Sequence, residues 1–221
     1  MLRRVPSEEI YRKLLHGLVV ILPVSIFYLP ALIGWNRILI LQVSAVLLLI
    51  SVSIEVLRLR SISFGNWFYL TFGSMLREEE KKHFSGATYV VGAIFLCAWL
   101  STVNEAFAAA AFLGLTLFIL GDAVAALAGK SVGRIRVGQK TLEGAIACFL
   151  LCFGLGYFIF PYLPQFTDNW GGGVSLVQAS LIAFSVAVLE LFPIKIGRLK
   201  INDNLYVPVF VSIIAFMVRD L

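Results

Sequence analysis

Long apolar runs separated by short polar segments make up most of this 221-residue chain. A helix that crosses a bilayer needs about 20 mostly apolar residues, and seven runs approach that length. They cover residues 14–34, 38–57, 86–103, 106–129, 142–162, 174–192 and 203–219. The polar gaps at 35–37 and 104–105 are so short that they predict tight antiparallel hairpins. The pattern predicts an all-α fold, a polytopic transmembrane helical bundle of about seven spans, with residues 1–221 forming one domain.

The composition agrees with an integral membrane protein. Hydrophobic residues make up 60% of the chain and charged residues 14%, against about 45–50% and about 25% in soluble domains. Cys97, Cys148 and Cys152 lie in apolar runs without metal-type spacing, so we expect them to pack in the core. The first apolar run contains His16 and has no small-residue cleavage site, so it does not resemble a secretory signal.

Lysine and arginine alternate between the two sides of the predicted bundle. Only Arg37 and Arg219 fall on one side. The other side has Arg3, Arg4, Arg12, Lys13, Arg58, Arg60, Arg77, Lys81, Lys82, Lys130, Arg134, Arg136, Lys140, Lys195, Arg198 and Lys200. By the positive-inside rule, the amino terminus is cytoplasmic and the carboxyl terminus outside. The net charge of +5 then faces anionic lipid head groups, and no nucleic-acid partner is expected.

The loop between the second and third runs contains an apolar, aromatic segment at residues 64–75, FGNWFYLTFGSM. It is too short to cross a bilayer. An interfacial amphipathic helix and a re-entrant or packed segment both fit this composition.

Ionisable residues inside the apolar runs share one depth. At about 1.5 Å per residue, Asp122 lies about 24 Å from the outer end of its helix, near the cytoplasmic edge. The positions at the same edge of other runs are His16, Glu55, Glu143, Glu190, Asp203 and Asn204. Charges within a membrane are costly and often mark functional sites. We therefore expect a single polar cleft that faces the cytoplasm.

Several of these positions also have structural alternatives. Glu55 would pair with Arg58, and Glu190 with a loop lysine, as interfacial anchors. The Asp203–Asn204 pair would cap the last helix. Arg12 and Lys13 would serve only as positive-inside anchors.

The stretch from Gly121 to Gly144 combines an acid with a basic, glycine-rich loop. Glycines let backbone N–H groups approach a phosphate, a helix amino terminus adds its dipole, and cations neutralise charge. The residues of this kind are Gly133, Arg134, Arg136, Gly138, Lys140, Thr141, Glu143 and Gly144. Because magnesium prefers carboxylates together with phosphate oxygens, Asp122 and Glu143 are the expected metal ligands. The glycine spacing matches neither GxxxxGK[ST] nor GxGxxG.

The run GDAVAALAGKSVGRIRVGQKTLEG at 121–144 resembles the signature of polytopic CTP-using lipid enzymes. This group includes dolichol kinases, phytol kinases, CTP-dependent diacylglycerol kinases and, more distantly, phosphatidate cytidylyltransferases. Three further segments resemble the kinase branch, so the likeness extends along nearly the full chain. They are RKLLHG at 12–17, the Arg77/Glu79 segment that leads into GATY at 86–89, and NDNLYVP at 202–208.

The resemblance implies a CTP-dependent kinase that phosphorylates the hydroxyl of a membrane lipid alcohol, either phytol, polyprenol or diacylglycerol, at the cytoplasmic face. It implies Mg²⁺ as cofactor and CTP as co-substrate, with CTP phosphates on the 133–144 segment. Asp122 would act with the metal, and His16 or Asp203 would accept the hydroxyl proton. The remaining expected substrate contacts are Arg12, Arg77, Glu79, Glu190 and Asn204.

Two alternatives stay open. A phosphatidate cytidylyltransferase would use a similar nucleotide stretch, but the chain has no histidine after His83 and ends in an Asp-Asn-Leu segment instead of a His-Gly-Gly…Asp-Arg signature. This difference favours the kinase. Asn202 precedes Asp203 where many relatives have a second acid. A non-catalytic anion transporter or scaffold is the other alternative, and a homodimer is one expectation for the oligomeric state.

Overall fold

The computed structural model describes residues 5–196 and 199–221. Arg3, Arg4 and Arg198, which contribute to the predicted charge asymmetry, lie outside the described residues. The helices are α1 (Ser7–Leu18), α2 (Ile21–Ile33), α3 (Arg37–Arg60), α4 (Ile62–Phe72), α5 (Gly86–Leu100), α6 (Glu105–Ser131), α7 (Leu142–Gly154), α8 (Phe166–Trp170), α9 (Leu176–Leu191) and α10 (Asp203–Val218). Short helical turns lie at Gly73–Met75, Glu78–Lys81, Leu155–Ile159 and Phe160–Tyr162. The prediction of an all-α fold is confirmed.

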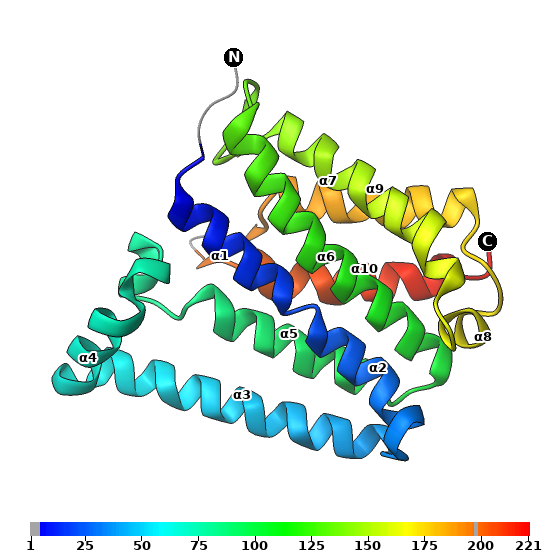
Figure 1. Cartoon of the computed structure of the whole chain (residues 1–221), viewed down its shortest axis with the longest axis horizontal. Helices are drawn as coiled ribbons and strands as arrows, with labels where there is room; N and C mark the ends of the chain where they lie inside the picture. The colour runs from blue at the N-terminus through cyan, green and yellow to red at the C-terminus, as the bar shows by residue number, and fades with distance from the viewer. Residues whose placement is uncertain (1–4, 197–198) are drawn as a thin grey trace.

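Helix α6 lies at the centre of the bundle, with α1 and α2 on one face and α7, α9, α10 and α5 on the others (Figure 1). Its small residues let neighbouring backbones approach closely, as is common in membrane helix packing. A Cβ added to Gly114 would lie 2.8 Å from the backbone nitrogen of Ser212 in α10. A Cβ at Gly121 would lie 2.8 Å from the sulfur of Cys148. All three cysteines are buried and unbridged, as their position in apolar runs predicts.

Four helical stretches in the described part of the chain are long and apolar enough to cross a membrane: Glu9–Ile33, Arg37–Arg60, Glu105–Ser131 and Leu142–Tyr162. The other three predicted spans coincide with the shorter apolar helices α5, α9 and α10. These have 15 or 16 residues, fewer than the roughly 20 that a perpendicular span needs. The count of seven spans therefore stays a prediction.

The first predicted span is two helices, because the chain turns at Val19–Val20 between α1 and α2. Helix α1 also begins earlier than the apolar run, at Ser7. Glu9, Arg12, Lys13 and His16 recur at three- and four-residue spacing, which places them on one face of a helix. Helix α1 packs against α6 (Figure 1). Glu9 and Lys13 are buried, so this polar face is directed into the protein.

The predicted helical segment at 64–75 forms α4 and the turn Gly73–Met75. Helix α4 lies at the edge of the molecule, beside the end of α3 (Figure 1). Its helical character agrees with the sequence, and its position relative to a membrane stays a prediction.

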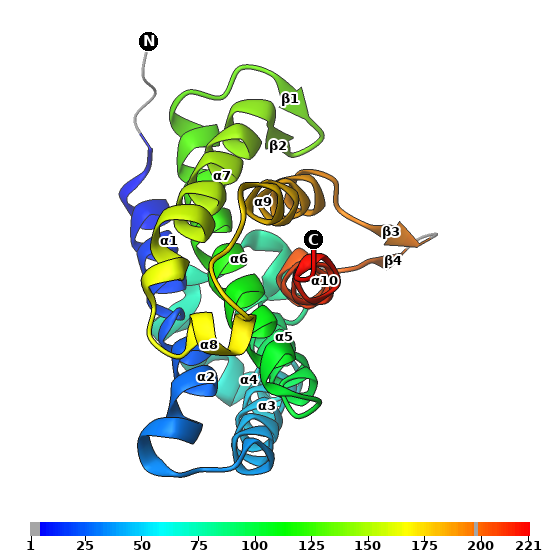
Figure 2. The same ribbon diagram turned by 90° about the vertical axis from the view of Figure 1, so that its right-hand side faces the viewer.

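Two short antiparallel hairpins connect helices at the end of the bundle where α1 begins. Strands β1 (Arg136–Val137) and β2 (Lys140–Thr141) join α6 to α7, and β3 (Lys195–Ile196) and β4 (Leu199–Lys200) join α9 to α10. Figure 2 shows β3 and β4 projecting from the bundle. Gly138 has φ +60°, which the two-residue turn between β1 and β2 requires. The turn is therefore sufficient to explain why residue 138 is a glycine, and no role in phosphate binding is needed to explain it.

Candidate active site between α1, α6 and α10

Asp122 lies on α6 and is nearly buried, with 8% of its surface exposed. The Nζ atom of Lys13 in α1 donates to Asp122 Oδ2 over 2.5 Å and reaches the Asp122 carbonyl oxygen at 3.4 Å. His16, one turn further along α1, places Nε2 at 3.4 Å from the same Oδ2. The structure thus brings together the predicted residues Asp122 and His16 and adds Lys13, which is not among the predicted site residues.

A second ion-pair group joins the start of α1 to the end of α6. The Glu9 carboxylate accepts from Arg12 Nη2 over 2.7 Å and lies 3.0 Å from Lys130 Nζ. Sequence reasoning did not single out Glu9 or Lys130 for this site. The signal was the spacing of Glu9 and Arg12 within α1, which places both on the face that contains Lys13 and His16.

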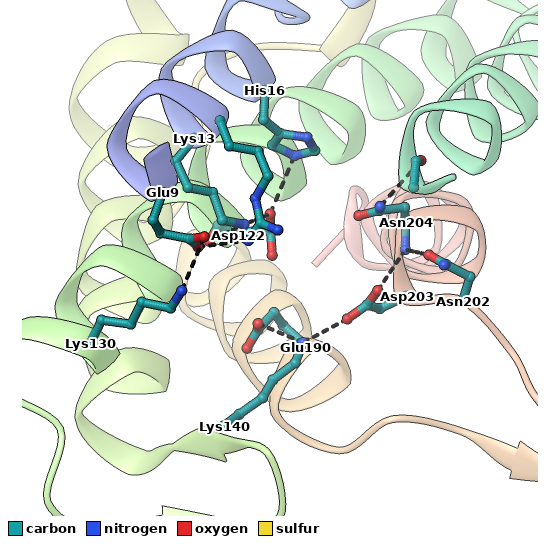
Figure 3. A network of polar contacts seen from close by, with 12 residues as sticks. Glu9, Lys13, His16, Asp122, Lys130, Lys140, Glu190, Asn202, Asp203 and Asn204 are labelled. Carbon is teal, nitrogen blue, oxygen red and sulfur yellow. Dashed lines mark hydrogen bonds and ion pairs between the residues drawn. The ribbon is translucent and has the colours of Figure 1, made fainter. Parts of the chain in front are cut away.

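Lys140 is the centre of a third group (Figure 3). Its Nζ donates to Glu190 Oε1 of α9 over 2.6 Å and to Asp203 Oδ2 of α10 over 2.7 Å. Burial alone would lower the pKa of Lys140, but the carboxylates of Asp203 and Glu190 raise that pKa above its ordinary value. The lysine therefore stays protonated, and the alternative in which Glu190 pairs with a loop lysine is confirmed.

These groups surround a polar cavity of about 390 Å³. Its basic lining residues are Arg12, Lys13, Arg77, Lys130, Arg136 and Lys140, and its acidic ones are Glu9, Glu78, Glu79, Asp122, Glu190 and Asp203. Within the part of the chain that the structure describes, Arg77 and Arg136 are the two cations of this lining without an ion-pair partner. They are the cations that an added anion engages without breaking an internal pair.

An apolar cavity of about 540 Å³ adjoins the polar one. Leu15 and Val19 line it from the side of α1, Phe68 and Phe72 from α4, and Val90 from α5. His16 and Asn204 also line it. The two cavities share Arg12, Lys13, Arg77 and Asp122 as lining residues. The Asp122 carboxylate therefore lies where a polar space and an apolar space meet.

Most of the predicted site residues line one of these two cavities. Asp203, Arg136, Lys140, Thr141, Gly144, Glu79 and Glu190 line the polar cavity, and Arg12, Arg77 and Asp122 line both. Thr141 Oγ1 also accepts from the Gly144 backbone N–H over 3.2 Å and so caps α7. These two residues contribute to helix packing as well as to the cavity wall.

Four predicted residues are not among the lining residues of either cavity: Gly133, Arg134, Gly138 and Glu143. The Glu143 carboxylate accepts from the backbone N–H groups of Arg134 over 2.8 Å and Ile135 over 3.1 Å. A Cβ at Gly133 would lie 2.2 Å from the Gly129 carbonyl oxygen, so close backbone packing requires this glycine. The structure gives both residues a role in shaping the loop and does not bring Glu143 to Asp122.

Glu55 is also outside the shared cleft. Its carboxylate pairs with Arg58 and accepts from Ser85 Oγ over 2.6 Å. The structural alternative for Glu55, an ion pair with Arg58, is confirmed.

The side chains where the two cavities meet could bind magnesium only if a bound phosphate supplied further oxygen ligands. The described residues contain no group of three or more His, Cys, Asp or Glu side chains that could hold a metal ion. Magnesium often takes one or two carboxylates and completes its shell with phosphate oxygens and water. Asp122 lines both cavities and fits that requirement, whereas Glu143 lines neither cavity and does not.

No protein-family model, characterised protein or solved structure matches the chain.

Proposed function

We propose that this protein is a CTP-dependent kinase of a membrane lipid alcohol. The observation that carries the proposal is the junction of the polar and apolar cavities at Asp122. A lipid alcohol has the matching shape: a hydrocarbon tail for the apolar cavity and a hydroxyl that reaches the polar one. Phytol, a polyprenol and diacylglycerol all share this chemistry. CTP rather than ATP is proposed from the resemblance of residues 121–144.

The nucleotide phosphates would bind in the polar cavity. Among the residues that the structure describes, Arg77 and Arg136 are the lining cations without an ion-pair partner. Arginine is well suited to phosphate because its planar fork donates two parallel hydrogen bonds. Asp122 would hold Mg²⁺ together with phosphate oxygens, and the ion would supply neutralisation of phosphate charge.

Phosphoryl transfer depends mainly on positioning and charge stabilisation. The lipid hydroxyl oxygen would attack the γ-phosphorus, forming a new P–O bond while the bond to the β–γ bridging oxygen breaks and CDP leaves. Nε2 of His16 is buried and lies 3.4 Å from Asp122 Oδ2, but it forms no hydrogen bond with any described residue. In the neutral imidazole with Nε2 unprotonated, this atom is placed to accept the hydroxyl proton at the junction. Asp203 is the weaker candidate for this base, because it accepts from Lys140 and lines only the polar cavity.

We further propose that the polar cavity faces the cytoplasm, where CTP is found, in a bundle of seven spans with its amino terminus on the same side. The charge asymmetry of the loops supports this orientation.

The decisive experiment uses purified protein in lipid nanodiscs with Mg²⁺ and CTP labelled at either the α- or the γ-phosphate. The lipids are phytol, a polyprenol, diacylglycerol and phosphatidate, with labelled ATP as a parallel nucleotide. The γ-label in an alcohol, with CDP released, supports the kinase. Transfer of the α-label to phosphatidate, with pyrophosphate released, would overturn the kinase proposal in favour of a cytidylyltransferase. No label in any lipid contradicts both enzymes and leaves the anion transporter or scaffold.

A further inference from the structure

Arg58, near the end of α3, has a fully buried guanidinium group although it lines neither cavity. Its Nε donates to Glu55 Oε2 over 3.1 Å, and its Nη2 contacts the same oxygen. The second Glu55 oxygen accepts from Ser85 Oγ. Buried charges are tolerated when they are paired and hydrogen-bonded, and this pair meets both conditions.

The remaining donors of Arg58 reach the segment that follows α3. Nη1 donates to Tyr69 Oη and to the Glu80 carbonyl oxygen, each over 3.0 Å. Nη2 donates to the His83 carbonyl oxygen over 2.7 Å. One side chain therefore ties α3 to α4 and to the stretch that leads into α5.

The tied segment continues to the wall of both cavities. The Glu80 carboxylate accepts from the backbone N–H of Arg77 and from that of Gly86, each over 2.8 Å. Arg77 lines both cavities, and Phe68 and Phe72 of α4 line the apolar one. The hydrogen bonds thus run from Arg58 through Glu80 to Arg77.

We propose that Arg58 is a positioning residue that holds the 61–85 segment, and with it Arg77, against the cleft. The catalytic part of this inference rests on the proposed function, in which Arg77 binds nucleotide phosphate next to the lipid. The structural part is independent of that function: the ordered conformation of residues 76–86 depends on the Arg58 guanidinium group.

The chemistry requires arginine in particular. Arg58 serves a carboxylate, a phenol and two carbonyl oxygens at once, and its planar group lies 5.6 Å from the Phe68 ring centroid. Lysine has one ammonium group in place of the five-donor fork, so it can keep the charge beside Glu55 but cannot reach all of these acceptors. Arg58→Lys therefore separates the ion pair from the wider network.

The first test measures hydrogen–deuterium exchange of the full chain in nanodiscs without substrate. In Arg58→Lys, amides in residues 76–86 should exchange about tenfold faster, as expected when a charge-assisted hydrogen bond that restrains local opening is lost. Amides in α6 and α7 should keep their wild-type rates. Tyr69→Phe removes one acceptor of Arg58 and also the hydrogen bond that Tyr69 Oη donates to the Lys81 carbonyl oxygen. It leaves the Arg58 bonds to the Glu80 and His83 carbonyl oxygens in place, so it should give a smaller change in the same segment. Equal exchange of residues 76–86 in wild type and Arg58→Lys would overturn the inference, whatever reaction the protein catalyses.

The second test is a double-mutant cycle on CTP turnover with Arg58→Lys and Arg77→Gln. If Arg58 acts through Arg77, the loss in kcat/KM of the double variant should be about tenfold smaller than the product of the two single losses. Coupling of this size is typical of residues in one network. Fully multiplicative losses would contradict the positioning role. Arg219→Lys is the matched control, because Arg219 also pairs with a carboxylate and lies over an aromatic ring, but at the far end of α10. It should leave both readouts unchanged.

Discussion

Lys13 of α1 and Asp122 of α6, 109 positions apart in sequence, are joined by a 2.5 Å contact between Nζ and Oδ2. Both side chains are largely shielded from solvent. This contact fastens the polar face of α1 to the central helix at the point where the two cavities meet. The same carboxylate is therefore both a structural partner of Lys13 and the acid nearest the proposed reaction.

Asp122→Asn should abolish CTP-dependent lipid phosphorylation, because the amide supplies neither the charge nor the metal-binding oxygen of the carboxylate. We expect initial rates to fall by about a hundredfold or more, in line with the loss of a group that stabilises transition-state charge. Radiolabelled transfer assays in nanodiscs measure this loss. Asp168→Asn is the matched control, because Asp168 is an exposed residue of α8 and lines neither cavity; it should keep wild-type rates. Survival of turnover in Asp122→Asn would remove Asp122 from the mechanism.

Stability and catalysis at this pair can be separated. Removing one partner of a buried ion pair costs about 3–5 kcal/mol, whereas replacing both by apolar residues of similar size is often neutral or better. Lys13→Met should therefore lower the unfolding midpoint, and the double variant Lys13→Met with Asp122→Leu should recover it while remaining inactive. Thermal unfolding in detergent and the transfer assay provide the two readouts. A double variant that stays as unstable as Lys13→Met would show that the contact is not the source of the stability.

Arg77→Gln and Arg136→Gln should each raise KM for CTP by about tenfold, since a charge-assisted hydrogen bond to phosphate is lost and no internal ion pair is disturbed. Arg134→Gln provides the comparison: it lies two residues from Arg136 but is not a lining residue of either cavity. Steady-state kinetics with CTP as the varied substrate measure the effect. An equal KM increase in Arg134→Gln would point to the general charge of the loop instead of two specific contacts.

Residue patterns predict most of the helices and some of the residues of the site. Asp122 and His16 stand out because a charge in an apolar run is costly, and both lie at the cleft. Lys13 does not, because a lysine near a membrane edge has an ordinary explanation in the positive-inside rule. Its partner on α6 is set by the turn at Val19–Val20 and by the direction of α1, which are tertiary features. The apolar runs also predict α5, α9 and α10, but tertiary packing decides where each of these helices ends.

Glu143 is predicted as a metal ligand but lies outside the cavities. An acid at the start of a helix can serve either as a metal ligand or as an acceptor for backbone N–H groups, and the sequence does not distinguish the two. Its carboxylate accepts from Arg134 and Ile135, so Glu143→Gln should loosen the loop without changing the metal requirement. We expect the Mg²⁺ concentration for half-maximal turnover to match wild type, while exchange of the Arg134 and Ile135 amides accelerates because a neutral amide oxygen is a weaker acceptor than a carboxylate. A Mg²⁺ titration of turnover and hydrogen–deuterium exchange give the two measurements. A large rise in the Mg²⁺ requirement would return Glu143 to the metal site, because loosening of the loop alone does not alter the ligands that Asp122 and the phosphates provide.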